Sequence, residues 1–206
     1  GTIGEIDQMM VPMNDRACVF GDGVYDATLA ANHKIYGMDE HVDRFFNSAA
    51  LLEIPMPCTK PELKQLLRDL VKKVDSPDQF VYFQVTRGTA MRNHSFPEGK
   101  ANLWVMLTPR KLTPIDKQVK LITVEDNRFY LCNIKTLNLI PSVLASQKAT
   151  LAGCDEAVFH RGDRVTECAH SNISILKDGV FRTAPLDRLI LPGTARKRLL
   201  EACAQL

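Results

Sequence analysis

The chain has 206 residues, which is enough for one large domain or two small ones. Its hydrophobic content of 45% is typical of a globular protein with a sizeable core. The 26 basic and 24 acidic residues nearly cancel, so the charge balance argues against a nucleic-acid or membrane partner.

No apolar run approaches the roughly 18 residues that a membrane-spanning helix needs, and the first residues do not resemble a signal peptide. The six cysteines are scattered and lack the close spacing of a metal site. Unpaired buried thiols in a reducing compartment are the simplest interpretation, so we expect a cytoplasmic protein without a bound metal.

Strands and helices alternate in the first half of the chain. Residues 24–31 favour a strand that turns at 32–34 and returns as a hairpin. Apolar residues spaced by three or four positions over 39–52 predict a helix with Asp39 as its N-cap.

A second helix and two further strands follow. Residues 59–62, Thr-Lys-Pro-Glu, form a capping box, and the 3.6-residue period over 63–74 predicts the helix behind it. Residues 79–87 and 102–108 are rich in β-forming side chains and are therefore predicted to be strands.

A domain boundary is expected near the middle of the chain. The segment 108–114 contains two prolines and shows no periodicity, which indicates a linker. We therefore expect a small N-terminal α/β domain over residues 1–112 and a larger C-terminal domain over residues 113–206.

The second half is predicted to mix strands and helices. Residues 119–124 favour a strand, and residues 140–151 favour a helix that begins with Ile-Pro and is ended by Gly153. Residues 173–183 predict a hairpin with an Asp-Gly turn of type I′. A last amphipathic helix is expected after Gly193.

Two charged residues carry the strongest chemical signal. Lys135 has apolar neighbours, and desolvation of its amine would lower the pKa and make the amine nucleophilic towards aldehydes. Glu167 is suited to hold a proton on a pyridine nitrogen, which turns that ring into an electron sink. Taken singly, each residue also fits an exposed position at a strand end or a turn.

The segments around these residues, 132–139 and 164–172, resemble those of the branched-chain and D-amino acid aminotransferases. These are the fold type IV enzymes that use pyridoxal phosphate (PLP). The resemblance continues in the family's order through residues 20–25, 40–44, 84–94 and 191–194. It implies a two-domain fold that mixes α+β and α/β features.

The resemblance also assigns the cofactor site. Lys135 would bind PLP covalently and its freed amine would then move the substrate Cα proton, while Glu167 would pair with the pyridine nitrogen. Arg44 would bind the phosphate, although an exposed helix arginine is the other interpretation.

Further cofactor contacts are implied near residue 194. Thr194 and Ala195 would offer backbone N–H groups to phosphate at a helix N-terminus, or would simply form an ordinary helix start. Leu191 would pack on the cofactor ring or belong to the core. Family members run on beyond the end of this helix, so we expect the C-terminal part of the fold to be incomplete here.

Three residues resemble the substrate-carboxylate trap of D-amino acid aminotransferase: Tyr25, Arg92 and His94. One fixed cation, one switchable cation and one hydroxyl donor suit a carboxylate. In the family, the Arg-x-His loop comes from the neighbouring subunit, which implies a homodimer; without the family, the loop would be interpreted as exposed and mobile. Tyr82 would supply a second hydroxyl or face inward from its strand.

The resemblance thus predicts a PLP-dependent aminotransferase that acts on a D-amino acid such as D-alanine and on 2-oxoglutarate or pyruvate. His170 departs from the family's small residues, and it would either tune the cofactor or point into solvent. The alternatives are a branched-chain aminotransferase, an aminodeoxychorismate lyase, or a non-catalytic or incomplete PLP-binding fragment.

Overall fold

The computed structural model describes residues 1–205, and the chain forms two compact units. The first unit contains Gly1–Thr113 together with the short segment Lys135–Leu137. The second unit contains Pro114–Ile134 and the chain from Asn138 onward. The division into domains over 1–112 and 113–206 stays a prediction, and the return of three residues to the first unit is a feature that the sequence did not suggest.

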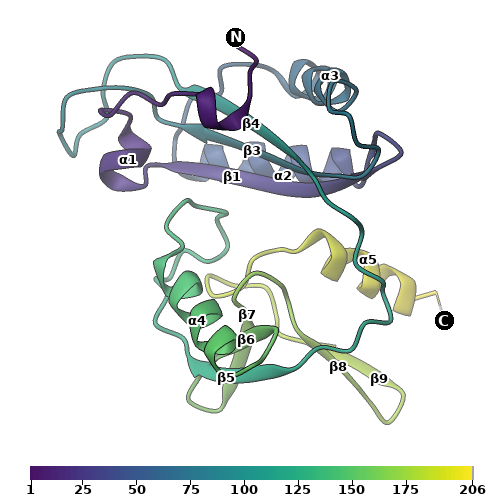
Figure 1. The fold of residues 1–206 in the computed structure, drawn as a ribbon. Helices are drawn as coiled ribbons and strands as arrows, with labels where there is room; N and C mark the ends of the chain where they lie inside the picture. The colour runs from purple at the N-terminus through teal and green to yellow at the C-terminus, as the bar shows by residue number, and fades with distance from the viewer. Residues whose placement is uncertain (206) are drawn as a thin grey trace. The chain divides into compact units, whose positions relative to one another are not determined.

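The first unit is built on a four-stranded antiparallel sheet with strand order β2-β1-β3-β4 (Figure 1). The strands are β1 (Gly23–Ala31), β2 (Lys34–Ile35), β3 (Gln79–Thr86) and β4 (Asn102–Pro109). These bounds confirm the hairpin and the two later strands that the sequence predicted.

The helices of the first unit are two short ones and two long ones. They are η1 (Ile6–Gln8), α1 (Arg16–Phe20), α2 (Met38–Leu51) and α3 (Lys60–Leu70). Figure 1 shows α2 running along one face of the sheet. The ring of Phe83 on β3 packs edge to face on Phe45 of α2, with centroids 5.0 Å apart. The opposite face of the sheet carries half-exposed side chains, among them Tyr25 and Tyr82.

Local signals account for one long helix better than for the other. The capping box at the start of α3 is confirmed, with both reciprocal bonds between Thr59 and Glu62 present. The predicted N-cap of α2 is wrong, because this helix begins one residue after Gly37, whose φ is 55°. Asp39 instead lies in the first turn, where its carboxylate pairs with Lys64 at 2.6 Å.

The second unit contains a mixed three-stranded sheet with order β5-β6-β7. Strand β5 (Leu121–Glu125) runs parallel to β6 (Glu156–Arg161), and α4 (Ile140–Leu151) makes the crossover between them. Strand β7 (Arg164–Cys168) returns antiparallel to β6.

A hairpin and a helix complete the described part of the second unit. The hairpin pairs β8 (Ser174–Lys177) with β9 (Val180–Thr183). Its turn has positive φ values of 51° at Asp178 and 73° at Gly179, as the type I′ prediction requires. The last helix is α5 (Thr194–Cys203), which begins after Gly193 as predicted.

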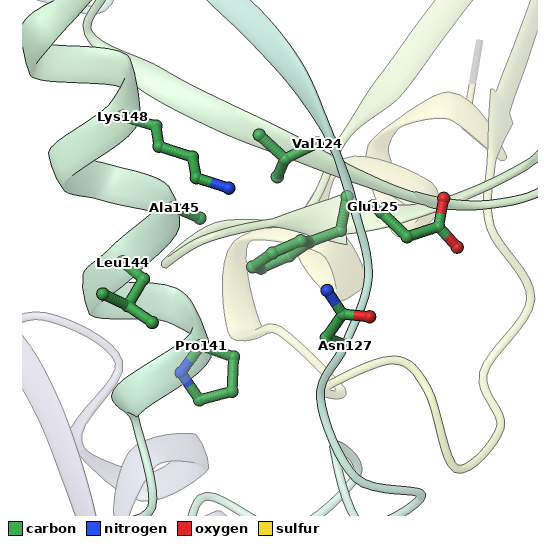
Figure 2. Close-up of a pocket in the computed structure, with 8 residues that line it drawn as sticks. Val124, Glu125, Asn127, Pro141, Leu144, Ala145 and Lys148 are labelled. Carbon is green, nitrogen blue, oxygen red and sulfur yellow. The ribbon is translucent and has the colours of Figure 1, made fainter.

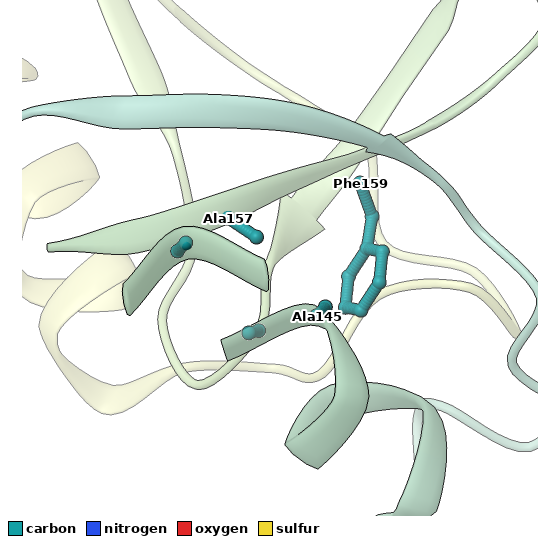
Figure 3. Packing of buried hydrophobic residues seen from close by; sticks show 5 residues of the cluster. Ala145, Ala157 and Phe159 are labelled. Atoms are coloured by element: carbon teal, nitrogen blue, oxygen red, sulfur yellow. The ribbon is translucent and has the colours of Figure 1, made fainter. Parts of the chain in front are cut away.

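Small side chains let α4 approach the sheet closely. Figure 3 shows Phe159 and Ala157 of β6 facing Ala145 of α4, and Ala149 and Ala169 complete this cluster of buried residues. Phe159 has the largest side chain of the cluster, and the small alanine side chains allow the helix to pack closely on the strands.

Two general features bear on the class of protein. No helix within residues 1–205 is long and apolar enough to cross a membrane. Across the same residues, no group of three or more His, Cys, Asp or Glu side chains is placed to hold a metal ion. All six cysteines, which lie within the described part of the chain, carry free thiols.

Candidate active site

Lys135 lies in the first unit, in the short segment that pairs with the start of β1. The N–H of Tyr25 donates to the Lys135 carbonyl over 2.9 Å. The N–H of Leu137 donates to the Gly23 carbonyl over 3.1 Å. A Cβ on Gly23 would lie 2.6 Å from Leu137 Cδ1 and 2.7 Å from the Val85 carbonyl oxygen, so this approach requires glycine.

The Lys135 amine lies against one of two stacked tyrosines. Nζ is 3.4 Å from Tyr25 Oη and 4.4 Å from the centre of the Tyr25 ring. The rings of Tyr25 and Tyr82 stack with centroids 5.4 Å apart. Burial and the neighbouring Tyr25 phenol raise the pKa of Tyr82 to about 12, so its hydroxyl stays protonated and donates to Gln84 Oε1 over 2.7 Å. The structure thus brings three predicted residues together: Lys135, Tyr25 and Tyr82.

Arg44, the predicted phosphate ligand, is held by a fully buried carboxylate. Its Nε and Nη2 donate to the two oxygens of Asp26 on β1, each over 2.8 Å. His41, one turn earlier on α2, places Nδ1 2.7 Å from Asp26 Oδ1. Burial would raise the pKa of the Asp26 carboxyl, but hydrogen bonds from His41 and Arg44 hold it below its ordinary value. We call Asp26, His41 and Arg44 the Asp26 cluster.

Arg92 and His94 lie in the exposed loop between β3 and β4. The Arg92 guanidinium carbon is 5.3 Å from the centre of the Phe20 ring, and the His94 ring centre is 5.1 Å from the same point. The structure therefore joins these two predicted substrate residues through Phe20 of α1, whereas Tyr25 belongs to the group around Lys135.

Glu167 lies on β7 in the second unit and is 5% exposed. Arg128 Nη1 donates to its Oε1. Asn172 Nδ2 and the backbone N–H of Leu191 donate to Oε2 over 2.9 and 3.1 Å. An ionised carboxylate only accepts hydrogen bonds, so these donors match its charged form.

Arg128 joins Glu167 to a second buried carboxylate. Its Nε and Nη2 donate to the two oxygens of Asp126, each over 2.9 Å. Thr166 Oγ1 donates to Asp126 Oδ2 over 3.0 Å, and Arg161 Nε lies 3.3 Å from the same oxygen. We call Asp126, Arg128, Arg161, Thr166 and Glu167 the Arg128 cluster.

The charges of the Arg128 cluster stabilise one another. Burial would raise the pKa of the Asp126 carboxyl, but hydrogen bonds from Arg128 and Thr166 and the Arg128 charge hold it below its ordinary value. Burial would lower the pKa of Arg128, but its bonds to Asp126 and Glu167 raise it. Both groups therefore stay charged at neutral pH.

The start of α5 is shaped by Asn172. A Cβ on the N-cap residue Gly193 would overlap Asn172 Oδ1, while Asn172 Nδ2 also donates to the Leu191 carbonyl over 3.0 Å. Gly193 has no side chain that could accept from the first-turn N–H groups, which belong to Thr194 and Ala195. In the second unit, Asn172 therefore hydrogen-bonds to Glu167 and to the Leu191 carbonyl while it packs against Gly193.

His170, the departure from the family pattern, has a side chain that is 69% exposed. Its Nδ1 lies 3.2 Å from Glu156 Oε1, and its backbone N–H donates to the same oxygen over 2.8 Å. The structure favours the interpretation that His170 points into solvent.

A pocket of about 140 Å³ lies between β5 and α4. It is lined by Val124, Glu125, Asn127, Pro141, Leu144, Ala145, Lys148 and Phe159. Figure 2 shows Lys148 extending from the helix towards Val124. None of the predicted site residues lines this pocket, and we do not assign the active site to it.

Sequence reasoning missed the residues that support the predicted charges. Asp26 had a detectable signal, because a carboxylate in the middle of an apolar strand is rarely buried without a partner. Arg128 had none, because Glu167 lies 39 positions further along the chain. Asn172 belongs to the segment 164–172 that carries the resemblance, but no local pattern indicated its bonds to Glu167 and to the Leu191 carbonyl.

Solved structures define the class of fold. The branched-chain aminotransferase of Thermoproteus uzoniensis superimposes with a TM-score of 0.89 at 20% identity, covering 97% of this chain and 71% of that one. A putative 4-amino-4-deoxychorismate lyase of Legionella pneumophila gives a TM-score of 0.87 at 23% identity, covering 97% and 75%. The mixed architecture predicted from the sequence, the fold type IV architecture, is confirmed.

Sequence comparison gives the family. The family model described as amino-transferase class IV matches residues 23–206. The D-alanine aminotransferase of Listeria monocytogenes serotype 1/2a (strain 10403S) is 40% identical over 203 residues, which is 96% of this chain and 70% of the relative. The chain belongs to the class IV aminotransferases and is a PLP-dependent enzyme, as the sequence predicted.

Proposed function

We propose that the enzyme transfers the amino group of a D-amino acid, D-alanine above all, to 2-oxoglutarate or pyruvate. The observation that carries this proposal is the 40% identity to a D-alanine aminotransferase over nearly the whole chain. The solved structures with other activities reach only 20–23% identity, at which the fold alone is shared.

The chemistry of the side chains fits PLP. When bound, PLP supplies an aldehyde that takes up an amine and a ring that accepts electrons. Lys135 offers the amine for that aldehyde, and Glu167 offers a buried carboxylate, bonded to Arg128, for the ring nitrogen. The phosphate would meet Arg44 and the N–H groups of Thr194 and Ala195, and Leu191 would pack on the ring.

Lys135 also acts as the base in this proposal. Its freed amine would move the proton from the substrate Cα to the C4′ carbon of the cofactor, and the reverse transfer would complete the return half of the reaction. Tyr25 Oη, 3.4 Å from Nζ, would hold the amine in place during this transfer. Glu167 would hold a proton on the ring nitrogen and so favour the electron-accepting form of the ring.

The substrate α-carboxylate would bind to Tyr25, Arg92 and His94, with the Tyr82 hydroxyl close by. Arg92 and His94 are exposed in the described chain, which suits residues that serve the active site of a second copy. We therefore propose a homodimer in which this loop enters the neighbouring subunit. The six free thiols support a place in the reducing cytoplasm.

The first test mixes the PLP-loaded protein with D-alanine or L-alanine, without an oxo acid, while the visible absorbance of the cofactor is followed. Loss of the band with D-alanine alone is the expected result. Loss with L-alanine instead would overturn the D-selectivity and favour the branched-chain activity. A stable band with both would favour the lyase activity, which transfers no amino group from alanine to the cofactor, or a branched-chain aminotransferase that does not accept alanine.

A second test probes the catalytic lysine and the dimer together. Lys135→Ala should lose activity, and Arg92→Ala should lose most of it at D-alanine concentrations that do not saturate the wild type. If the loop serves the neighbour, mixed and reassembled subunits should regain about a quarter of the wild-type sites, because half of the dimers are hybrid and each hybrid has one intact site. No recovery in verified hybrid dimers would mean that Arg92 serves its own subunit.

A further inference from the structure

The ring of Phe20 is a shared contact for three basic side chains of the first unit. Arg16, Arg92 and His94 have guanidinium carbons or ring centres 4.7, 5.3 and 5.1 Å from its centre. Phe20 itself is the last residue of α1 and is half-buried, so its ring position is set by the fold. The loop residues Arg92 and His94 are exposed.

The backbone of the loop is fixed from the same helix. Arg16 is buried and donates through Nη1 to the carbonyls of Asn93 and Ser95, over 2.6 and 3.4 Å. Its Nε donates to Asp22 over 2.7 Å. Asn93 lies between the two exposed basic residues, so Arg16 sets the chain position from which both side chains extend.

A second anchor holds the far side of the loop. Arg87 donates to the Asp22 carboxylate and to the carbonyls of Leu52 and Glu53. Its guanidinium carbon lies 3.6 Å from the centre of the Phe96 ring. The loop is therefore anchored at two points, and the side chains between these points need a further contact to be ordered.

That contact is Phe20. A guanidinium and an imidazole that must meet one carboxylate lose rotamer freedom when the ligand binds, which adds an entropic cost to binding. The face of an aromatic ring attracts a guanidinium, and an aromatic pair favours a tilted imidazole. Both interactions are available at Phe20, where the His94 ring is tilted by 53°.

We propose that Phe20 is a positioning residue that orders Arg92 and His94 for the substrate α-carboxylate. This inference rests on the proposed function, in which those two residues bind the carboxylate. Arg16 fixes the loop backbone, and Phe20 fixes the side chains that the backbone carries.

The test compares Phe20→Leu, which keeps an apolar side chain but removes the ring, with Phe20→Tyr, which keeps the ring. In single-turnover reactions of the PLP-loaded enzyme, Phe20→Leu should raise the half-saturating D-alanine concentration about tenfold, with a much smaller change in the maximal rate. Phe20→Tyr should stay within about twofold of wild type. Val19→Ala, an exposed position on the same helix, is the matched control and should change neither value.

Arg92→Ala and His94→Ala separate this inference from the proposed function. If neither raises the half-saturating concentration, the carboxylate assignment itself fails. If they do but Phe20→Leu does not, the proposed function stands and the role of Phe20 is overturned. A fall in the maximal rate of Phe20→Leu with unchanged saturation, at an unchanged melting temperature, would likewise contradict a positioning role.

Discussion

The two units each hold one of the predicted cofactor residues by an opposite charge, but with the signs exchanged. In the Asp26 cluster the predicted residue is a cation, Arg44, and a buried anion supports it. In the Arg128 cluster the predicted residue is an anion, Glu167, and a buried cation supports it. In both cases a charge that would be costly to bury alone is compensated by a side chain from a neighbouring segment.

The difference lies in how far the compensation extends. Asp26 is bonded directly by Arg44 and His41. Arg128 is shared between Glu167 and Asp126, and Asp126 is itself held by Thr166 and Arg161. Removing Arg128 therefore takes the shared cation from two buried carboxylates, whereas removing Asp26 takes one carboxylate from Arg44 and His41.

The largest effect is expected from Arg128→Met. Two buried carboxylates would lose their shared cation, and the loss of free energy of unfolding should be about 3–5 kcal/mol. Urea unfolding of the purified protein measures it. Arg164→Met, which removes a surface partner of Asp187, is the control and should cost about 1 kcal/mol or less. Equal losses in both variants would contradict the central place of Arg128.

A smaller loss is expected from Asp26→Asn. The amide can still accept one hydrogen bond from Arg44 but carries no charge, so the loss should be about 2 kcal/mol. Affinity for PLP should also fall, because Arg44 would no longer be held in one orientation. Asp43→Asn is the matched control for both measurements. Asp43 lies on α2, the helix that carries Arg44, and pairs with exposed Lys60. Unchanged PLP affinity in Asp26→Asn would separate Arg44 from the phosphate.

Acid should weaken both clusters in the same direction. The pKa values of Asp26 and Asp126 are lowered in the folded protein, so their contribution is complete above the ordinary carboxyl pKa of about 3.9 and is lost as the pH falls through the lowered values. The free energy of unfolding should therefore fall below about pH 4. In Asp26→Asn the fall should be shallower, and an unchanged slope would show that Asp26 does not titrate on unfolding.

The smallest effect is expected from Thr166→Val. This change removes one donor to Asp126 while Arg128 and Arg161 remain, so it should cost about 1 kcal/mol. A loss as large as that of Arg128→Met would mean that the hydroxyl, rather than the arginine, keeps Asp126 satisfied. Combining both changes in a double-mutant cycle measures the coupling between these two residues.

The elements that the sequence predicted well depend on groups close together in the chain. The capping box joins Thr59 to Glu62 three residues later, and the type I′ turn depends on Asp178 and Gly179 alone. The prediction that Asp39 is the N-cap of α2 was wrong. Gly37, in a left-handed conformation, is the N-cap, so Asp39 lies within the first turn of the helix.

The sequence by itself determined the family and most of the longer helices and strands, because these depend on short segments, although β6 and β7 were not predicted. It also predicted the charged residues for the cofactor. The tertiary structure alone decided what holds those charges. Arg128 meets Glu167 across 39 positions, and Lys135 meets Tyr25 across 110. Such contacts depend on which backbones are brought together by burial of the apolar core, and no local pattern specifies the partner.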